Sequence, residues 1–458
     1  MNYFSTRDKS LKYSFKEVFL RGLAPGGGLF LPSETKKYSK EELNKLRKLN
    51  YKELATEIIF NFCNKEINKP ELRSLIDKSY SSFRENEVVS IKKIGKVNLL
   101  ELYHGPTLAF KDIAMQVIGN LYDYLEVAKN KIVNIVVATS GDTGSAAISA
   151  LSNRKNINLF VLHPHNKISN IQRKIMTTNN GENIYNLAIK GSFDDCQKIV
   201  KELFNEDDFR VQINMSGVNS INWARIVCQI VYYFYSYFKL QKNNVSFSVP
   251  TGNFGDIYAG YVAKKMGLPI NKLIVATNKN DILQRVINTG EYKPGTVKSS
   301  ITPSMDIQVA SNFERLLFYI LGESDSSVSS LMKNLSSKGL FNLRKKEIEK
   351  IKLDFEGIKI TDEETADIIE EIYKVHQFII DPHTATGFGA ANRTKNLADI
   401  IVLGTAHPYK FSDIIKKTIG KTLEPPEHLK FNLDKKEIFD IIENSNSEVK
   451  NYILSKIQ

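Results

Sequence analysis

One lysine stands out in this chain by its setting. Lys111 lies in the stretch HGPTLAFKDIAMQ, which runs from His104 to Gln116 and has a Gly-Pro turn and an apolar step before the lysine. A lysine amine near a strand end becomes a nucleophile when burial or nearby positive charge lowers its pKa. A solvated lysine at the start of a helix would have the same local sequence, so the spacing alone leaves both interpretations open.

Two loops rich in small residues each follow an apolar run and precede a helical pattern. ATSGDTGSAA (138–147) follows IVNIVV, and PTGNFGDIYAGY (250–261) follows VSFSV. Small residues let a backbone approach a ligand closely, and free N–H groups at a helix start attract an anion. The second loop therefore predicts a phosphate cup formed by Gly252, Asn253, Phe254, Gly255 and Asp256, although either loop alone would also suit a turn without ligand. It is neither a Walker loop nor GxGxxG.

A third group of polar residues precedes the most apolar stretch of the chain. NSINWAR contains Asn219, Ser220 and Arg225, and the sequence continues as IVCQIVYYFYSYF, which predicts a buried helix. The guanidinium fork of arginine suits a phosphate, and serine and asparagine add neutral donors. Helix capping beside a surface arginine is the alternative.

The elements that must position these residues follow from the apolar pattern. The first ~95 residues have helical spacing, with a capping box at Ser39 and Glu42. From Val97 onward, helix-like segments separate apolar runs, which are NLLELYH, IVNIVVATS, INLFVLHP, NIYNLAIKG, VSFSVP, KLIVATN, FIID and DIIVLGT. This alternation predicts an α/β fold with parallel sheets covered by helices, in which ligands bind at the carboxyl ends of strands. A charged segment over residues 324–364 is interpreted as a surface insertion or lobe edge.

Composition narrows the class of protein. The chain has 458 residues, enough for about three domains or lobes. Its net charge of +12 is spread over scattered lysines, which favours a site for an anionic small molecule over a nucleic-acid surface. No apolar run is long enough to span a membrane and no signal peptide is evident. The three cysteines lie far apart, which favours the cytoplasm, and the seven histidines predict no metal site.

The motifs together resemble those of the threonine synthase family. The matching pieces span most of the chain: YFSTRD, GLAPGGGLFLP, HGPTLAFKD, ATSGDTGSAA, NSINWARIVCQIVYYF, PTGNFGDIYAGY, PSMDIQVASNFERLLF, DPHTATG and GTAHPYKF. The resemblance implies the fold of pyridoxal 5'-phosphate (PLP) enzymes of the tryptophan-synthase-β type, called fold type II. It implies a threonine-synthase-type N-terminal region (1–95), a bilobed catalytic domain (96–425, smaller lobe roughly 140–235) and a C-terminal helical tail (426–458).

The resemblance also implies roles for residues. Lys111 matches the lysine that holds PLP covalently, and residues 252–256 match the loop that binds the cofactor phosphate. Thr405 matches the threonine that bonds the pyridine nitrogen. Asn219, Ser220 and Arg225 correspond to the group that binds the substrate phosphate, and Ser140 and Thr143 are further candidates for substrate binding. Asp142 departs from the wider fold type, where asparagine meets the cofactor's 3-hydroxyl, because a carboxylate there would repel a phenolate-like oxygen.

The implied reaction converts O-phospho-L-homoserine and water to L-threonine and phosphate. A phospholyase of the same fold, which would release 2-oxobutyrate, is the first alternative, and a non-catalytic basic binding protein on this scaffold is the second. Lys111 argues against the second alternative, because a binding scaffold does not need the amine. The expected partner is a small-molecule substrate, and neither a nucleic acid nor a membrane is expected to bind. The protein is expected to be cytoplasmic and to be a monomer or homodimer.

Overall fold

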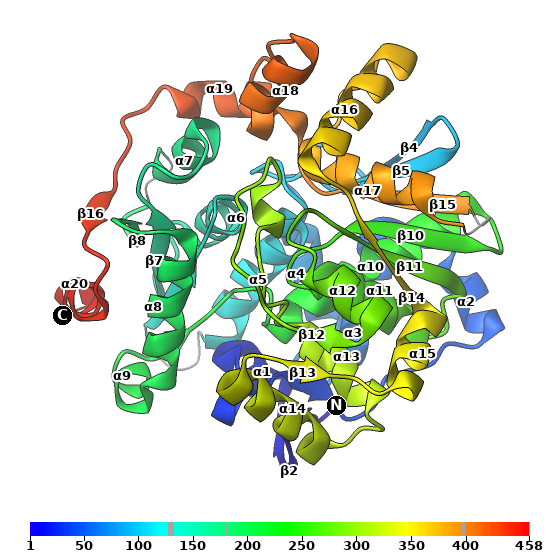
Figure 1. Cartoon of the computed structure of the whole chain (residues 1–458). Helices are drawn as coiled ribbons and strands as arrows, with labels where there is room; N and C mark the ends of the chain where they lie inside the picture. The colour runs from blue at the N-terminus through cyan, green and yellow to red at the C-terminus, as the bar shows by residue number, and fades with distance from the viewer. Residues whose placement is uncertain (127–131, 179–180, 396–398, 458) are drawn as a thin grey trace.

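Two parallel-type sheets, each covered by helices, form the body of the molecule (Figure 1). The computed structural model describes residues 1–126, 132–178, 181–395 and 399–457. The two sheets confirm the predicted α/β class with two lobes. The proposed domain boundaries at residues 95 and 425, and the range 140–235 for the smaller lobe, stay predictions.

The larger sheet has six strands in the order β14-β11-β10-β15-β5-β4. These are β4 (Ser90–Ile94), β5 (Val97–Glu101), β10 (Val245–Pro250), β11 (Ile270–Thr277), β14 (Phe355–Lys359) and β15 (Asp399–Gly404). All neighbours are parallel except β4, which is antiparallel to β5. The central strand β10 is buried along its whole length, as expected for a parallel strand with helices on both faces.

The smaller sheet has five strands in the order β16-β8-β7-β6-β9, all parallel to their neighbours. They are β6 (Val133–Ala138), β7 (Ile157–Pro164), β8 (Ile184–Ile189), β9 (Met215–Ser216) and β16 (Asp440–Ile442). The edge strand β16 comes from the C-terminal end of the chain, which crosses from α18 (Ser412–Ile419) through α19 (Glu427–Leu433) to reach it (Figure 1). The last helix, α20 (Asn446–Ile457), then packs against α8 (Phe193–Asn205) of the same lobe.

The N-terminal region combines helices with a small antiparallel sheet. It contains β1 (Tyr3–Ser5), β2 (Asp8–Tyr13), α1 (Phe15–Arg21), β3 (Phe30–Pro32), α2 (Lys40–Leu46), α3 (Tyr51–Cys63) and α4 (Lys69–Ser79). The predicted capping box is confirmed, because the Ser39 side chain accepts from the Glu42 backbone N–H at the start of α2 and the Glu42 carboxylate accepts from the Ser39 N–H. The helix α1, the glycine turn of Pro25–Gly27 and the short strand β3 follow one another along the chain before α2.

The remaining helices connect or cover the sheets. Those around the smaller sheet are α5 (Lys111–Glu126), α6 (Asp142–Leu151), α7 (Asn170–Thr177) and α9 (Asp207–Gln212). Those near the larger sheet are α10 (Trp223–Leu240), α11 (Gly255–Lys265), α12 (Ile282–Thr289), α13 (Phe313–Ile320), α15 (Lys345–Asp354), α16 (Asp362–His376) and α17 (Pro382–Arg393). The helix α14 (Asp325–Lys338) packs against α13 and the N-terminal strand β2. A two-stranded ribbon joins β12 (Glu291–Tyr292) to β13 (Phe341–Asn342).

The helix α10 lies at the centre of the packing. Every side chain from Trp223 to Phe238 is buried, and α10 packs against α3, α5 and α11. This confirms the predicted buried helix, and it places the start of α10 deep in the molecule. Among the described residues, no helix is long and apolar enough to cross a membrane.

One prediction about the larger sheet was wrong. The run FIID (378–381) is not a strand but irregular chain, because Asp381 caps α17 and Pro382 begins that helix. The charged segment over residues 324–364 contains the edge strand β14, which agrees with its interpretation as a lobe edge. The sequence of that strand, FEGIK, has too little apolar character to be recognised as a strand.

Candidate active site

One cavity collects every residue predicted to bind or react. It lies where β6, β10 and β15 end, and its lining includes Lys111, Ser140, Asp142, Thr143, Asn219, Ser220, Arg225, Gly252, Asn253, Phe254, Gly255, Asp256 and Thr405. The carboxyl ends of parallel strands meet at one edge of each sheet, which is why loops far apart in sequence converge here.

Lys111 is the first residue of α5, and its side chain is largely buried. The loop before it is tied to the end of β15, because the Phe110 N–H donates to the Thr405 carbonyl over 2.9 Å. Burial lowers the pKa of the Lys111 amine, and the positive charges of Lys410 and Arg225 act in the same direction. The carboxylate of Asp142, whose Oδ2 lies 3.1 Å from Nζ, opposes this shift.

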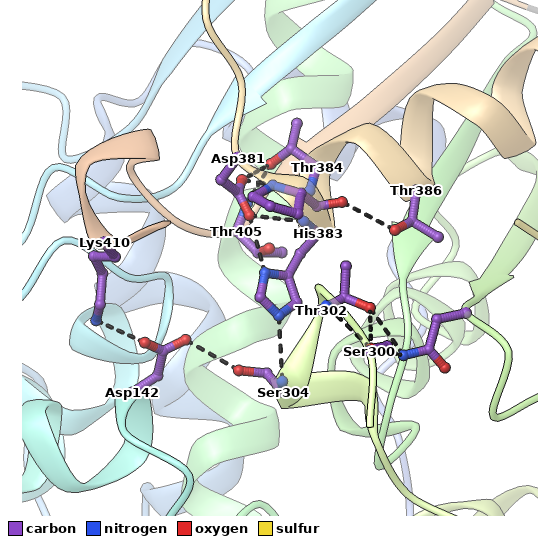
Figure 2. A network of polar contacts seen from close by, with 12 residues as sticks. Asp142, Ser300, Thr302, Ser304, Asp381, His383, Thr384, Thr386, Thr405 and Lys410 are labelled. Carbon is purple, nitrogen blue, oxygen red and sulfur yellow. Dashed lines mark hydrogen bonds and ion pairs between the residues drawn. The ribbon is translucent and has the colours of Figure 1, made fainter. Parts of the chain in front are cut away.

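Asp142 begins α6 and sits among several donors. Its carboxylate accepts from Lys410 Nζ over 2.7 Å, from Gln172 Nε2 over 3.0 Å and from Ser304 Oγ over 3.2 Å. Burial by itself would raise the pKa of this carboxyl, but the two lysines outweigh burial and hold the pKa well below its usual value. Figure 2 shows Lys410 and Ser304 pointing at Asp142 from opposite sides.

A chain of polar groups continues from Asp142 to the end of β15 (Figure 2). The Ser304 backbone N–H donates to His383 Nε2 over 3.3 Å, and His383 Nδ1 lies 3.0 Å from the Asp381 carboxylate. Because Nε2 accepts, Nδ1 carries the proton and donates to Asp381. Asp381 also accepts from the Thr384 hydroxyl, and that hydroxyl accepts from the Thr405 N–H over 3.3 Å.

The predicted phosphate cup is a turn at the start of α11. Phe254 has a left-handed backbone (φ 63°), and Gly255 is the first helical residue. Gly252 lies tightly against the neighbouring chain, since a Cβ there would meet the Ser304 carbonyl at 2.8 Å. The Asp256 carboxylate accepts from two tyrosines of α10, and burial raises its pKa to about 6. What the turn offers an anion is therefore backbone N–H groups, not the Asp256 side chain.

Arg225 lies in the first turn of α10 and is buried. Its Nη1 donates to the Val218 carbonyl over 3.3 Å, and its Nε has no hydrogen-bond partner among the described residues. Burial lowers the pKa of this guanidinium to about 10. No described carboxylate forms an ion pair with it. A buried cation of this kind is suited to an anionic ligand.

Asn312 joins the loop before α10 to the phosphate cup. Its Nδ2 donates to the Ser220 carbonyl over 3.2 Å and to the Asn253 carbonyl over 3.1 Å. A Cβ on Gly255 would lie 3.7 Å from the Ser220 Cβ, so the two loops are in near contact. The cavity thus has two adjacent anion-binding elements, one made of backbone N–H groups and one made of a guanidinium.

Comparison with known proteins decides the family. The family model for the threonine synthase N terminus matches residues 2–80, that for pyridoxal-phosphate dependent enzymes matches 90–403, and that for the threonine synthase C-terminal part matches 384–453. The threonine synthase of Pseudomonas aeruginosa is 40% identical, over 99% of this chain and 98% of that protein. The chain belongs to the threonine synthase family.

Solved threonine synthases have the same fold. The crystal structure of PLP-bound threonine synthase from Brucella melitensis has a TM-score of 0.95 at 41% identity, over 100% of both chains. The yeast threonine synthase structure has a TM-score of 0.93 at 40% identity, over 100% of this chain and 98% of that one. These likenesses confirm the predicted fold type II and the predicted cofactor.

The residues of this threonine synthase family member fit PLP. An aldehyde needs an amine, which a desolvated Lys111 provides, and a phosphate needs N–H groups such as those at the start of α11. The Thr405 side chain lines the same cavity and offers a hydroxyl. Among the described residues, no cluster of three or more His, Cys, Asp or Glu side chains is arranged to hold a metal ion.

Several residues of the site escaped the sequence analysis. Lys410, His383, Ser304 and Gln172 contact Asp142 or extend its polar chain. Three of them lie in motifs of the family resemblance, GTAHPYKF, DPHTATG and PSMD, but nothing in their spacing indicates that they meet Asp142. Gln172 lies outside the family motifs, and nothing in the sequence indicates its contact with Asp142.

Proposed function

We propose that this chain converts O-phospho-L-homoserine and water to L-threonine and phosphate with PLP as cofactor. The observation that carries the proposal is a single cavity that holds a desolvated lysine amine beside two separate anion-binding elements. The reaction needs all three, because both the cofactor and the substrate bear a phosphate group and the cofactor is held by an amine.

The residues that the sequence predicted for the cavity each have a proposed role. The Lys111 amine would hold the cofactor, and residues 252–256 would bind its phosphate through backbone N–H groups. The Thr405 hydroxyl would bond the pyridine nitrogen, and Asp142 would lie beside the 3-hydroxyl. Arg225, with Asn219 and Ser220, would bind the substrate phosphate. The hydroxyls of Ser140 and Thr143, at the N-terminal end of α6, would donate to the substrate.

When bound, PLP supplies an electron sink that stabilises negative charge at the substrate α-carbon. Once the amine of the substrate has displaced it from the cofactor, the neutral Lys111 amine would act as the base that takes the α-proton, which its lowered pKa permits. The Thr405 hydroxyl cannot hold the ring nitrogen charged as a carboxylate would, which moderates the sink at the α-carbon and suits a reaction that continues to the β- and γ-carbons. Arg225 binds the departing phosphate and offsets its charge.

The test is product identification with purified enzyme. O-phospho-L-homoserine should yield L-threonine and inorganic phosphate in equal amounts, and the Lys111→Ala variant should yield neither. Accumulation of 2-oxobutyrate in place of threonine would favour the phospholyase. Equal turnover by wild type and Lys111→Ala would remove the lysine from the mechanism.

The setting of the enzyme is also part of the proposal. All three cysteines, Cys63, Cys196 and Cys228, are free and buried, which supports a reducing compartment such as the cytoplasm. We propose a monomer or homodimer whose partner is the small-molecule substrate, and not a nucleic acid.

A further inference from the structure

A second lysine contacts Asp142 from outside the cavity lining and has no role in the reaction described above. Lys410 lies in the short 3-10 helix η3 (Pro408–Phe411), and its side chain is completely buried. Its Nζ donates to the Thr107 carbonyl over 2.9 Å and to Asp142 Oδ1 over 2.7 Å. A buried ammonium is costly, so its position beside the reactive lysine requires an explanation.

Asp142 lies between the two lysines. Lys410 approaches Oδ1 and Lys111 approaches Oδ2, over 2.7 Å and 3.1 Å. With all three groups ionised, the triad carries a net charge of +1. When Lys111 loses its proton, the triad becomes neutral, because Lys410 alone balances the carboxylate. Without Lys410, the same loss would leave Asp142 as an unbalanced buried anion, which would hold the proton on Lys111.

We propose that Lys410 is a positioning residue that neutralises Asp142 and thereby allows the Lys111 amine to lose its proton and react. The inference rests on the proposed function, in which Lys111 is the amine that captures the cofactor. Only a neutral amine attacks the aldehyde of PLP. The ammonium first gives a proton to solvent; a carbon–nitrogen double bond then forms between Nζ and the aldehyde carbon, and one water leaves.

Other charges around Lys111 act alongside this triad. Arg225 of α10 faces the amine with positive charge, and Asp256 of α11 faces it with a carboxyl whose pKa is itself raised to about 6. Burial raises the pKa of Asp256, whereas the two tyrosines that donate to its carboxylate favour the charged form. Neither Arg225 nor Asp256 forms an ion pair with Asp142. The charge of Asp142 is therefore balanced by the two lysines that contact it directly.

Two further titratable groups face Asp142 and Lys410. His383 of α17 faces Asp142, and Asp112, the neighbour of Lys111 in α5, faces Lys410. Asp112 accepts from the Thr107 N–H and hydroxyl over 2.8 and 2.6 Å, and burial raises its pKa. Because Asp112 has its own donors, Lys410 remains the direct counter-ion of Asp142.

The experiment measures how fast the full chain, stripped of cofactor with hydroxylamine, captures added PLP at pH values from 5.5 to 10. The absorbance change gives a second-order rate constant whose pH midpoint reports Lys111. Lys410→Met keeps the length of the side chain and removes its charge. It should raise the midpoint by about 1–3 pH units and slow capture at least tenfold below it. Lys410→Arg keeps the positive charge, so its midpoint should stay close to the wild-type value.

Substitution of the carboxylate gives the opposite sign. Asp142→Asn should lower the midpoint, and the double variant Lys410→Met with Asp142→Asn should return it towards wild type. Lys264→Met is the matched control, because Lys264 pairs with Asp354 (2.7 Å) outside the cavity lining, and its midpoint should not move.

The outcomes separate the inference from the proposed function. If Lys111→Ala captures PLP at the wild-type rate, the proposed role of Lys111 fails. If Lys111→Ala is inert but Lys410→Met keeps the wild-type midpoint, only the role of Lys410 is overturned. Should Lys410→Met not fold, Lys410→Gln takes its place: a higher midpoint supports the charge balance, and an unchanged or lower midpoint refutes it.

Discussion

Arg225 and Arg315 are two buried arginines for which we expect opposite effects on stability. Burial lowers the pKa of each guanidinium to about 10. Arg315 uses all three nitrogens, donating to the Phe30 carbonyl over 3.0 Å, to the Ile221 carbonyl over 2.7 Å and to the Asn312 side chain. Arg225 makes a single side-chain bond of 3.3 Å, and its Nε is unpartnered among the described residues.

The magnitudes follow from these bonds. The lowered pKa of Arg225, from 12.5 to about 10, means that the folded protein disfavours its charge by about 3 kcal/mol. Arg225→Met removes that penalty and one long bond, so the free energy of unfolding without ligands should stay the same or rise. Arg315→Met removes a similar penalty but also three hydrogen bonds, and it leaves their buried acceptors unpaired, so it should lower the free energy of unfolding by about 2–6 kcal/mol.

Although substitution of Arg225 should cost little stability, it should strongly reduce catalysis. Charge-assisted bonds to the substrate phosphate are worth about 1.5–3 kcal/mol each, so the loss of a bidentate pair should lower kcat/KM by about 10²–10⁴-fold. The loss should appear mainly as a higher KM, with the cofactor spectrum intact, and Arg225→Lys should recover only part because the fork is gone.

Urea unfolding of the cofactor-free chain and steady-state kinetics with O-phospho-L-homoserine check both halves. If Arg225→Met destabilises the protein as much as Arg315→Met does, Arg225 is structural and the reasoning fails. If Arg225→Met instead abolishes cofactor binding and spares KM, the two phosphate sites have been assigned the wrong way round.

Three further changes test the site and the fold. Gly252→Ala should weaken PLP binding by about 1–3 kcal/mol in a cofactor titration, since its Cβ would meet the Ser304 carbonyl at 2.8 Å; Gly295→Ala, whose Cβ would have its nearest neighbour at 3.7 Å, should bind normally. Thr405→Asp should shift the absorption spectrum of the bound cofactor and change the ratio of threonine to side products; an unaltered spectrum and ratio would count against a bond to the ring nitrogen. His163 is buried with both ring nitrogens unpartnered among the described residues, and burial lowers its pKa to about 4, so the folded state disfavours its protonation. The buried neutral His163 therefore has no effect on the pH dependence of folding above pH 6.5. The free energy of unfolding falls by about 3 kcal/mol as the pH drops from 6.5 to about 4, because only the unfolded chain binds the proton there. His163→Leu should flatten that acid loss in urea titrations.

The polar chain of Figure 2 illustrates how the site is built from distant segments. Asp142 begins α6, Ser304 lies in the turn of Pro303–Met305, and Asp381 and His383 lie at the start of α17. The contact between His383 and Asp381 is local, because the two residues lie together at the start of α17. The contact between Ser304 and Asp142 joins segments far apart in the chain, so it forms only when the whole chain has folded.

The amino-acid sequence was enough to predict the candidate reactive groups and most of the strands. Lys111, the loop 252–256 and Arg225 were predicted because nucleophile, phosphate-cup and guanidinium chemistry depends on residue type and on a few neighbours along the chain. The buried strands were predicted because parallel strands covered on both faces must be almost continuously apolar. The edge strand β14 was missed because an edge carries no such requirement.

Which charged groups lie next to one another could be seen only in the folded chain. In the sequence, Asp142 is a carboxylate that would repel a phenolate-like oxygen, whereas in the fold Lys410 contacts it at 2.7 Å and balances its charge. Likewise, Arg225 and Arg315 are the same residue type in the sequence, and only the fold shows that they have different hydrogen-bond partners. The physical reason is that electrostatic free energy depends on distance and burial, and both are set by how segments far apart in the chain pack together.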